Sequence, residues 1–320
     1  MNPIGVGFLD LNAEGLFHLE RMRLRPDFRC VAGWNPDQRL PTAHGFLEHV
    51  AKSPQALIDD PRISMFWIGP RVDPSLIGLA LAEGKHVLLG LPVNTPPDVW
   101  KSWAAPRASG SKANLFVAAL HRWDGTFQTV QQLVRAGDLG QLLDVRRISR
   151  QYVPVELGLK TTASGSVVDP NLDPTRVQQI KWFEMLDELL QLVPDPVVSV
   201  LAQQTGSGCM VNVEFATGCR AWLELNRRSL APLETGWVLD GTAAGFADGK
   251  RFRPGPDYEL IDVPVEELPT DQAAFYNSVV TTIQEGDWKK SPVSSDSIQR
   301  VLELIELIRK SMRAGRTVPV

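Results

Sequence analysis

The residues that could bind a phosphate group lie near the start of the chain, in DLNAEG at residues 10–15. The preceding run IGVGFLD is typical of a strand and the following run LFHLERM of a helix, so DLNAEG is the turn between them. In a GxGxxG dinucleotide loop, the first glycine permits the tight turn and the second lets the backbone approach the pyrophosphate. Asp10 and Asn12 stand in those two places, and only the third glycine, Gly15, is present.

Each replacement has a physical consequence for cofactor binding. Asn12 could still adopt a left-handed backbone, which Asn tolerates better than most residues, but its side chain fills space that the phosphate would use. The Asp10 carboxylate, about 5 Å from one phosphate charge at an effective dielectric near 20, would repel it by roughly 3 kcal/mol. That is about a hundredfold in affinity, and solvent screening or a rotated side chain would reduce it. Dinucleotide binding is therefore disfavoured but not excluded.

A second nucleotide contact is expected where the next strand ends. Dinucleotide folds usually carry an acidic residue there, which accepts the ribose hydroxyls. The run FRCVAGWN ends in Asn35, which can hydrogen-bond but has no charge, and which could equally be a turn residue before Pro36. With Gly69 and Pro70, which end the run SMFWIGP, the candidate cofactor-binding residues are Asp10, Asn12, Gly15, Asn35, Gly69 and Pro70.

These positions need a parallel sheet to hold them, and the first part of the chain predicts one. Strands are expected at IGVGFLD, FRCVAGWN, SMFWIGP, HVLLGLP and NLFVAAL, with helical stretches between them. Successive apolar residues indicate strands buried on both faces. We therefore expect residues 1–122 to form an α/β domain with a doubly wound parallel sheet of the Rossmann type.

The pattern changes from about Gln141, where apolar and polar residues alternate. In VNVEF and AWLELN, the apolar residues at alternate positions, such as Val211, Val213 and Leu223, face one side of the sheet, and Trp222 faces the other. Residues 123–320 should therefore form a second α/β domain with an open sheet. Its mixed face, with Trp222, is a candidate subunit interface, although a helix of the same chain could also cover it.

Two helices are expected in this second half. One has Asp173 as its N-cap and Pro174 in its first turn, after a Gly-, Ser- and Thr-rich loop at residues 155–171, and the other runs from about Ser295 to Arg313. The polar residues of the first helix fit a solvated face, which is the favoured interpretation. They are Gln178, Lys181, Glu184, Asp187 and Glu188.

Composition excludes several classes of partner. The 33 basic and 37 acidic residues give a net charge of −4, with no basic footprint for nucleic acid or an anionic membrane. No apolar run approaches the roughly 20 residues that span a bilayer, and no secretory signal is evident, so a cytoplasmic location is expected. Cys30, Cys209 and Cys219 are too scattered for a metal site, so no metal is expected, and we interpret them as small buried hydrophobic residues.

The chain resembles the Gfo/Idh/MocA oxidoreductases, the family of glucose-fructose oxidoreductase and inositol dehydrogenase, over nearly its whole length. Four stretches carry the resemblance: FLDLNAEGLFHLERM with FRCVAGWNPD, LAEGKHVLLGLPV, HRWDGTFQTVQQLVRAGDLGQLLDVRRI and LELIELIRKSMRAGRTVPV. It implies NAD or NADP as cofactor, a mostly antiparallel C-terminal sheet that mediates oligomerisation, and a last helix packed back on the Rossmann half.

The same resemblance locates the catalytic positions, and the chain departs from the family at each of them. The family's EKP motif, whose lysine polarises the substrate hydroxyl, is Gly90, Leu91 and Pro92 here. The family's aspartate and histidine align with Ile180 and Glu184, and the five histidines of the chain all lie at or before residue 121. Candidate substitutes are Glu184 as a base with a burial-raised pKa, Lys181 as a hydrogen-bond donor, and Arg122. Arg122 and Asp124, in HRWD, could line the substrate cleft or be structural.

The sequence therefore favours a Gfo/Idh/MocA homologue that has lost nicotinamide-dependent hydride transfer and acts as a binding or assembly module. Its expected ligand is a sugar-like small molecule, and its expected state is a homodimer or homotetramer formed through the C-terminal sheet. One alternative is an active NAD- or NADP-dependent oxidoreductase on a sugar or polyol derivative, using Glu184, Lys181 or Arg122. Another is an enzyme of hydration or isomerisation without a dinucleotide.

Overall fold

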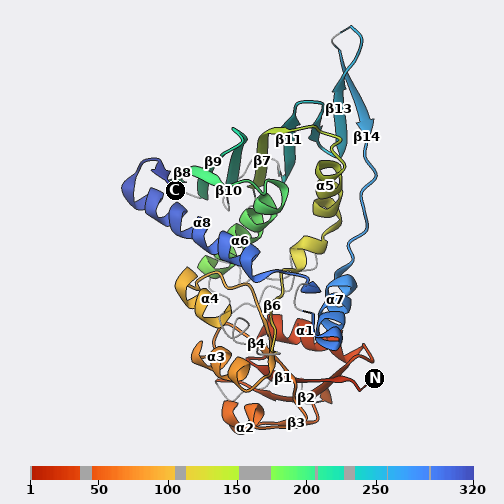
Figure 1. Cartoon of the computed structure of the whole chain (residues 1–320), viewed down its shortest axis with the longest axis vertical. Helices are drawn as coiled ribbons and strands as arrows, with labels where there is room; N and C mark the ends of the chain where they lie inside the picture. The colour runs from red at the N-terminus through yellow and green to blue at the C-terminus, as the bar shows by residue number, and fades with distance from the viewer. Residues whose placement is uncertain are drawn as a thin grey trace. The chain divides into compact units, whose positions relative to one another are not determined.

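The structure, a computed structural model, consists of two compact units (Figure 1). The described residues are 2–36, 45–104, 113–150, 174–205, 208–226, 235–257, 259–287 and 290–320. Those of the first unit fall within residues 1–119, 158–176 and 273–299, and those of the second within 120–157, 177–272 and 300–320. The loop expected at residues 155–171 and the expected cap Asp173 lie outside the described residues.

The first unit is built on a parallel sheet whose described strands have the order β3-β2-β1-β4-β5-β6. The five strands that the apolar runs predict are confirmed, and β1, β4 and β6 are buried at every residue. The short β3 was not expected, because it has only two residues and both are exposed. The strands are β1 (Ile4–Leu9), β2 (Phe28–Trp34), β3 (His49–Val50), β4 (Met65–Ile68), β5 (His86–Leu89) and β6 (Leu115–Val117).

Helices connect these strands, and one helix from a later part of the chain also belongs to this unit. The helices are α1 (Ala13–Arg23), α2 (Pro54–Ile58), α3 (Ser75–Ala82) and α4 (Pro97–Ala104), and α7 (Gln272–Glu285) follows much later in the chain. In the core of this unit, the Tyr276 hydroxyl of α7 lies 2.7 Å from Nδ1 of His18 in α1, and the His18 ring stacks on Trp67. Burial, with nearby Arg21, lowers the pKa of His18 to about 3, so the imidazole is uncharged at neutral pH.

The second unit is built on a mostly antiparallel sheet with the described order β14-β13-β12-β11-β7-β10-β9-β8-β15. Only the pair β7 and β10 is parallel within this order of described strands. The strands are β7 (Leu142–Arg150), β8 (Val197–Thr205), β9 (Gly208–Phe215), β10 (Arg220–Asn226), β11 (Thr235–Gly241), β12 (Gly245–Ala247), β13 (Lys250–Pro254), β14 (Leu260–Pro264) and β15 (Val318–Pro319).

Three helices pack on one face of this sheet: α5 (Gly125–Arg135), α6 (Pro174–Leu192) and α8 (Ser295–Ala314). Phe127 of α5 contacts Trp237 of β11, Glu188 of α6 lies against Arg147 of β7, and Ser311 of α8 accepts a hydrogen bond from the β8 backbone. The alternation that the sequence predicts is confirmed, because Val211, Val213 and Leu223 are buried and Trp222 is 42% exposed. Within the described residues, no helix is both long enough and apolar enough to span a bilayer.

The three cysteines are buried, as expected from the sequence. Burial raises the pKa of the Cys30 and Cys209 thiols to about 12 and that of Cys219 to about 11. They are therefore protonated at neutral pH and pack as small hydrophobic residues.

Candidate functional site

The first candidate site lies at the carboxyl ends of β1, β4 and β5 in the first unit. The chain runs from β1 outward to β2 and β3, and β4, β5 and β6 extend from the other side of β1. The crevice beside such a reversal of strand order is where open α/β sheets bind their ligands. The segments after β1, β4 and β5, at residues 10–15, 69–74 and 90–96, meet at this edge (Figure 1).

Asp10 is built into the core of this edge. Its side chain is fully buried, and its backbone has a φ of 76°, in the left-handed region that few residues other than glycine adopt. Its Oδ2 accepts a hydrogen bond from the Arg71 backbone at 3.0 Å, and its Oδ1 accepts two more from the Arg71 guanidinium, one of them from Nε at 2.8 Å. The position of the first glycine is thus taken by a carboxylate that is paired with the Arg71 guanidinium.

Two glycines make room for Asp10. A Cβ added at Gly69 would lie 2.6 Å from Asp10 Oδ2, which is closer than real Cβ atoms approach. A Cβ added at Gly15 would lie 2.7 Å from the Asp10 carbonyl oxygen and 2.9 Å from Trp67 Nε1. Both glycines are therefore required by the packing of the protein itself.

Asn12 and Asn35 hold the loop in shape. Asn12, which could have adopted a left-handed backbone, has an extended one with φ and ψ of −75° and −173°, and Asp10 takes the left-handed conformation instead. Asn12 is the N-cap of α1, and its side chain accepts a hydrogen bond from the Gly15 amide at 2.8 Å. Asn35 is buried, and its Oδ1 accepts from the Leu11 amide at 2.5 Å.

A second carboxylate lies at the same edge. A Cβ at Gly90 would be 2.7 Å from Oε1 of Glu14, so the Glu14 side chain reaches from the first turn of α1 to the end of β5. At the N-terminus of α1, a place that attracts anions in nucleotide-binding loops, the Gly15 amide donates to the side chain of Asn12, and Glu14 lies in the first turn.

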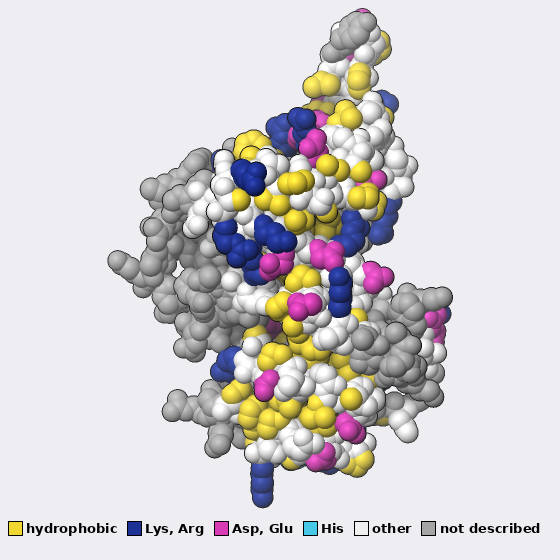
Figure 2. Space-filling view, turned by 60° about the vertical axis from the view of Figure 1, so that its left-hand side comes forward, with side chains coloured by type: hydrophobic (Ala, Val, Ile, Leu, Met, Phe, Trp, Pro, Cys, Tyr) yellow, Lys and Arg dark blue, Asp and Glu magenta, His cyan; other side chains and the backbone are white. Residues whose placement is uncertain are grey.

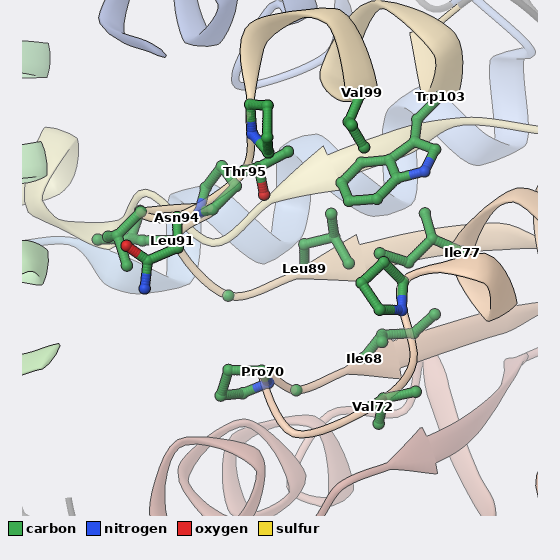
Figure 3. A pocket seen from close by; sticks show the side chains of 16 residues that line it. Ile68, Pro70, Val72, Ile77, Leu89, Leu91, Asn94, Thr95, Val99 and Trp103 are labelled. Carbon is green, nitrogen blue, oxygen red and sulfur yellow. The ribbon is translucent and has the colours of Figure 1, made fainter. Parts of the chain in front are cut away.

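An apolar cavity of about 330 Å³ opens between the ends of β4 and β5 and the starts of α3 and α4 (Figure 3). Leu91, which aligns with the lysine of the EKP motif, is 7% exposed and forms part of its wall, as do Gly69 and Pro70. Its other lining residues are Ile68, Val72, Pro74, Ile77, Leu89, Gly90, Pro92, Val93, Asn94, Thr95, Pro96, Val99 and Trp103.

The second candidate site is a buried ion cluster in the second unit. Arg122 and His121 lie in a short 3₁₀ helix (Leu120–Trp123), and both contact Asp187 of α6. The Arg122 guanidinium donates to both Asp187 oxygens, at 2.7 and 2.6 Å, and His121 Nε2 lies 2.7 Å from Asp187 Oδ2. The Asp187 side chain is fully buried, and that of His121 is 7% exposed. Asp124, also in HRWD, caps α5 through the Phe127 amide.

Asp187 and His121 shift each other's pKa towards the charged form. Burial alone would raise the pKa of Asp187, but Arg122 and His121 outweigh it and lower the pKa to about 2. Burial likewise disfavours the imidazolium of His121, yet the hydrogen bond and charge of Asp187, with Glu184 and Glu188, leave its pKa above the ordinary value. Burial raises the pKa of Glu188, against the effect of Arg147.

The interpretation of the polar residues of α6 as a solvated face is therefore wrong for two of them. Asp187 and Glu188 are buried, because they lie on the side of α6 that packs against the 3₁₀ helix and β7. Lys181 and Glu184 are half-buried and form an ion pair at 3.0 Å, and Ile180 is also half-buried. A signal was present in the sequence, since Asp187 stands four residues after Phe183 and three before Leu190, on the apolar stripe.

The fold is shared with proteins of known structure. The sequence matches no protein-family model, and no curated protein is similar to it. A candidate oxidoreductase from Bacillus subtilis superposes with a TM-score of 0.82 at 15% identity, covering 99% of this chain and 98% of that one. An NAD-binding protein from Listeria innocua gives 0.79 at 20% identity, covering 99% and 96%. A candidate myo-inositol dehydrogenase from Sinorhizobium meliloti gives 0.74 at 18%, covering 99% of both chains.

Proposed function

We propose that the chain belongs to the Gfo/Idh/MocA oxidoreductases by descent, that it no longer transfers hydride to or from a nicotinamide cofactor, and that it acts as a binding or assembly module. The kinship is supported by the four sequence stretches that resemble the family and by the fold shared with oxidoreductases and an NAD-binding protein. The loss of hydride transfer rests on the chemistry of the first candidate site.

The observation that carries the proposal is the buried carboxylate of Asp10. A surface aspartate could rotate away from a phosphate, but this one is fixed by three hydrogen bonds from Arg71 and by contact with Gly69. Arg71 offsets part of the repulsion of about 3 kcal/mol that a lone carboxylate would exert. A pyrophosphate that drew Arg71 to itself would, however, have to break these hydrogen bonds.

The neighbouring groups act in the same direction. The Gly15 amide, one of the donors that a helix N-terminus offers to a phosphate, already donates to Asn12. Glu14 brings a second negative charge to the edge, beside Gly90. The residues present therefore do not fit a dinucleotide pyrophosphate.

The positions aligned with the catalytic residues also lack the required chemistry. Leu91 is an apolar wall residue that can neither donate a proton nor carry charge. Ile180 has no titratable group, and the carboxylate of Glu184 is engaged by Lys181. Hydride transfer from an alcohol needs a base that accepts the hydroxyl proton; Leu91 and Ile180 cannot accept it, and the Glu184 carboxylate is held by Lys181.

For the assembly role, we propose a homodimer or homotetramer formed through the face of the second-unit sheet opposite to α5, α6 and α8. Trp222, 42% exposed, lies on that face next to Arg146 in the register of β10 and β7. Basic, acidic and apolar side chains are interspersed on the side of the molecule in Figure 2. A cytoplasmic location and a sugar-like small molecule as ligand complete the proposal.

Calorimetric titration with NAD, NADH, NADP and NADPH tests the proposal. We expect no heat of binding and no rise in thermal stability at 1 mM cofactor, whereas a ligand at a hundred times its Kd would stabilise the fold by about 2.7 kcal/mol. Saturable binding of any of the four below about 1 mM would contradict the proposal. The Listeria innocua protein, which is named for NAD binding, serves as the positive control.

One observation favours a second candidate function, an active oxidoreductase on a sugar or polyol derivative. His121 and Asp187 form a buried hydrogen-bonded pair, the arrangement in which an aspartate orients a catalytic histidine. The raised pKa of His121 argues against it, because it favours the protonated imidazole, which cannot act as a base. Polyol-dependent formation of NADH or NADPH that His121→Ala abolishes and Asp124→Ala preserves would establish this function, and a chain inactive on a polyol panel would exclude it.

A further inference from the structure

We propose that the cavity between the ends of β4 and β5 binds a small, neutral molecule with an apolar ring. The inference deepens the proposed function, because it names the class of ligand that the first unit would take in place of a dinucleotide. It rests on the lining of the cavity, on an aromatic wall and on the charges that surround it.

The size and lining of the cavity fit a small apolar ligand. Its volume of about 330 Å³ lies at the small end of the range for ligand pockets, roughly 300–1,000 Å³. Aliphatic side chains from both strands and both helices point into it, among them Ile68, Leu89 and Ile77 (Figure 3). Burying the apolar surface of a ligand here would stabilise it by about 25 cal/mol per Å².

Leu91 and Trp103 give the cavity its particular character. Leu91 stands at the position where the Gfo/Idh/MocA oxidoreductases have a charged lysine. Its aliphatic side chain therefore keeps this wall of the cavity apolar. Trp103 of α4 presents its indole to the cavity, and Trp100 packs edge-on against that indole at 6.2 Å between ring centroids. An aromatic ligand can stack on or pack edge-on against such a held indole, which adds to its apolar burial.

The charges around the cavity select against anions. Asp10 contacts the lining residue Gly69, Glu14 contacts the lining residue Gly90, and Asp73 and Asp98 adjoin lining residues in the sequence. Among the described residues, two cations stand against these four carboxylates: the guanidinium of Arg71, which is bound to Asp10, and Lys101, which lies between the lining residues Val99 and Trp103 in α4. The surroundings are therefore negative, and an anion would be repelled where a neutral molecule of the same shape would not.

Two polar side chains can orient a ligand. Asn94 and Thr95, in the segment after β5, line the cavity among otherwise apolar side chains. A few polar groups in a mostly apolar pocket are the usual arrangement by which proteins fix the orientation of a small molecule. A ring that carries a single hydroxyl matches this lining better than a sugar, whose many hydroxyls would lose their hydrogen bonds to water.

Two probes of the same ring system test the proposal by calorimetric titration at pH 7: neutral naphthalen-2-ol and anionic naphthalene-2-carboxylate. The blocking variant is Val99→Trp, which fills the cavity from α4, and its matched control is Lys101→Trp, an exposed site on the same helix that does not line the cavity. We expect saturable binding of naphthalen-2-ol with a Kd of about 1 mM or lower. Naphthalene-2-carboxylate should bind the natural protein at least about tenfold more weakly than naphthalen-2-ol does, and Val99→Trp should weaken the binding of naphthalen-2-ol by at least about tenfold. Lys101→Trp should leave the binding of naphthalen-2-ol unchanged.

Three results would overturn the site: no saturable binding of naphthalen-2-ol, equal binding of the two probes, or unchanged binding by a Val99→Trp protein whose thermal unfolding shows that it is folded. If Val99→Trp fails to fold, Leu91→Lys takes its place as the blocking variant. A charged side chain in the cavity wall should weaken the binding of the neutral naphthalen-2-ol if the site exists. A result that refutes this site does not affect the proposal that the chain binds no nicotinamide cofactor. Conversely, NAD binding that naphthalen-2-ol does not displace would refute the proposed function and leave this site intact.

Discussion

Replacing Asp187 by asparagine tests the buried cluster most directly. The change keeps the shape of the side chain but removes the negative charge that faces Arg122 and His121 inside the second unit. Because the guanidinium stays buried when its counter-charge is removed, the variant should lose about 3 to 5 kcal/mol of stability.

The pKa of Asp187 gives a second, independent magnitude. Its fall from 3.8 to about 2 on folding is worth about 2.5 kcal/mol at about 1.4 kcal/mol per pKa unit. Since the folded-state pKa is depressed, this contribution is present above about pH 4 and is lost as the pH falls through about 2. The difference between the natural protein and Asp187→Asn should therefore shrink as the pH falls from about 4 towards 2.

Urea unfolding, with hydrogen exchange of residues 177–192 as a local probe of the second unit, measures the loss. The matched control is Glu184→Gln on the same helix, whose partly exposed ion pair with Lys181 should contribute less than about 1 kcal/mol. If Asp187→Asn costs no more than Glu184→Gln at pH 7, the cluster does not hold the 3₁₀ helix to α6 and the reasoning fails.

Three further predictions follow from the described contacts. Gly69→Ala should destabilise the first unit by about 1 to 3 kcal/mol, because the new methyl group meets the Asp10 carboxylate, and the cost should largely disappear in an Asp10→Gly background; additive losses in urea unfolding would refute the contact. Gly78→Ala, in the interior of α3 with open space around it, should instead stabilise by about 0.5 to 1 kcal/mol, and a clear loss of thermal stability would contradict this. His121 should titrate above pH 6.5 by NMR, so its stabilising contribution is complete below that pH and declines as the pH rises through the folded-state pKa; a pKa below 6.5, or one that Asp187→Asn leaves unchanged, would disprove the coupling.

Local sequence patterns were sufficient for the architecture. Successive apolar residues located β1, β4 and β6, and alternation located β9 and β10 with Trp222 outward, because burial on one or two faces follows from the order of residues alone. The two-residue β3 gave no such pattern, since both of its side chains are exposed.

The position of the loop after β1 could be predicted, but its conformation could not. The sequence allowed a left-handed backbone at Asn12, because Asn tolerates it better than most residues. In the folded chain Asp10 adopts it, since Arg71 and Gly69, some 60 residues later, supply its hydrogen bonds and its space. A contact between two loops at such separation leaves no trace in the spacing of either one.

The ion cluster was missed for a related reason. Gln178, Lys181, Glu184, Asp187 and Glu188 were grouped as one solvated face of an amphipathic helix because all five are polar. Helical geometry divides them, and the partner of Asp187 that decides its burial, His121, lies 66 residues earlier. Position on the apolar stripe indicated burial, whereas charge type suggested exposure, and position was the better guide.

The contact of Asp10 with Gly69 and Arg71 also constrains how this protein can change over generations. A glycine at position 10 alone gives up three hydrogen bonds, and any side chain at position 69 alone collides with the carboxylate. The three positions are therefore coupled, and each can vary freely only after another has changed. Relatives that carry an aspartate at the place of Asp10 should accordingly carry glycine and arginine at the other two places.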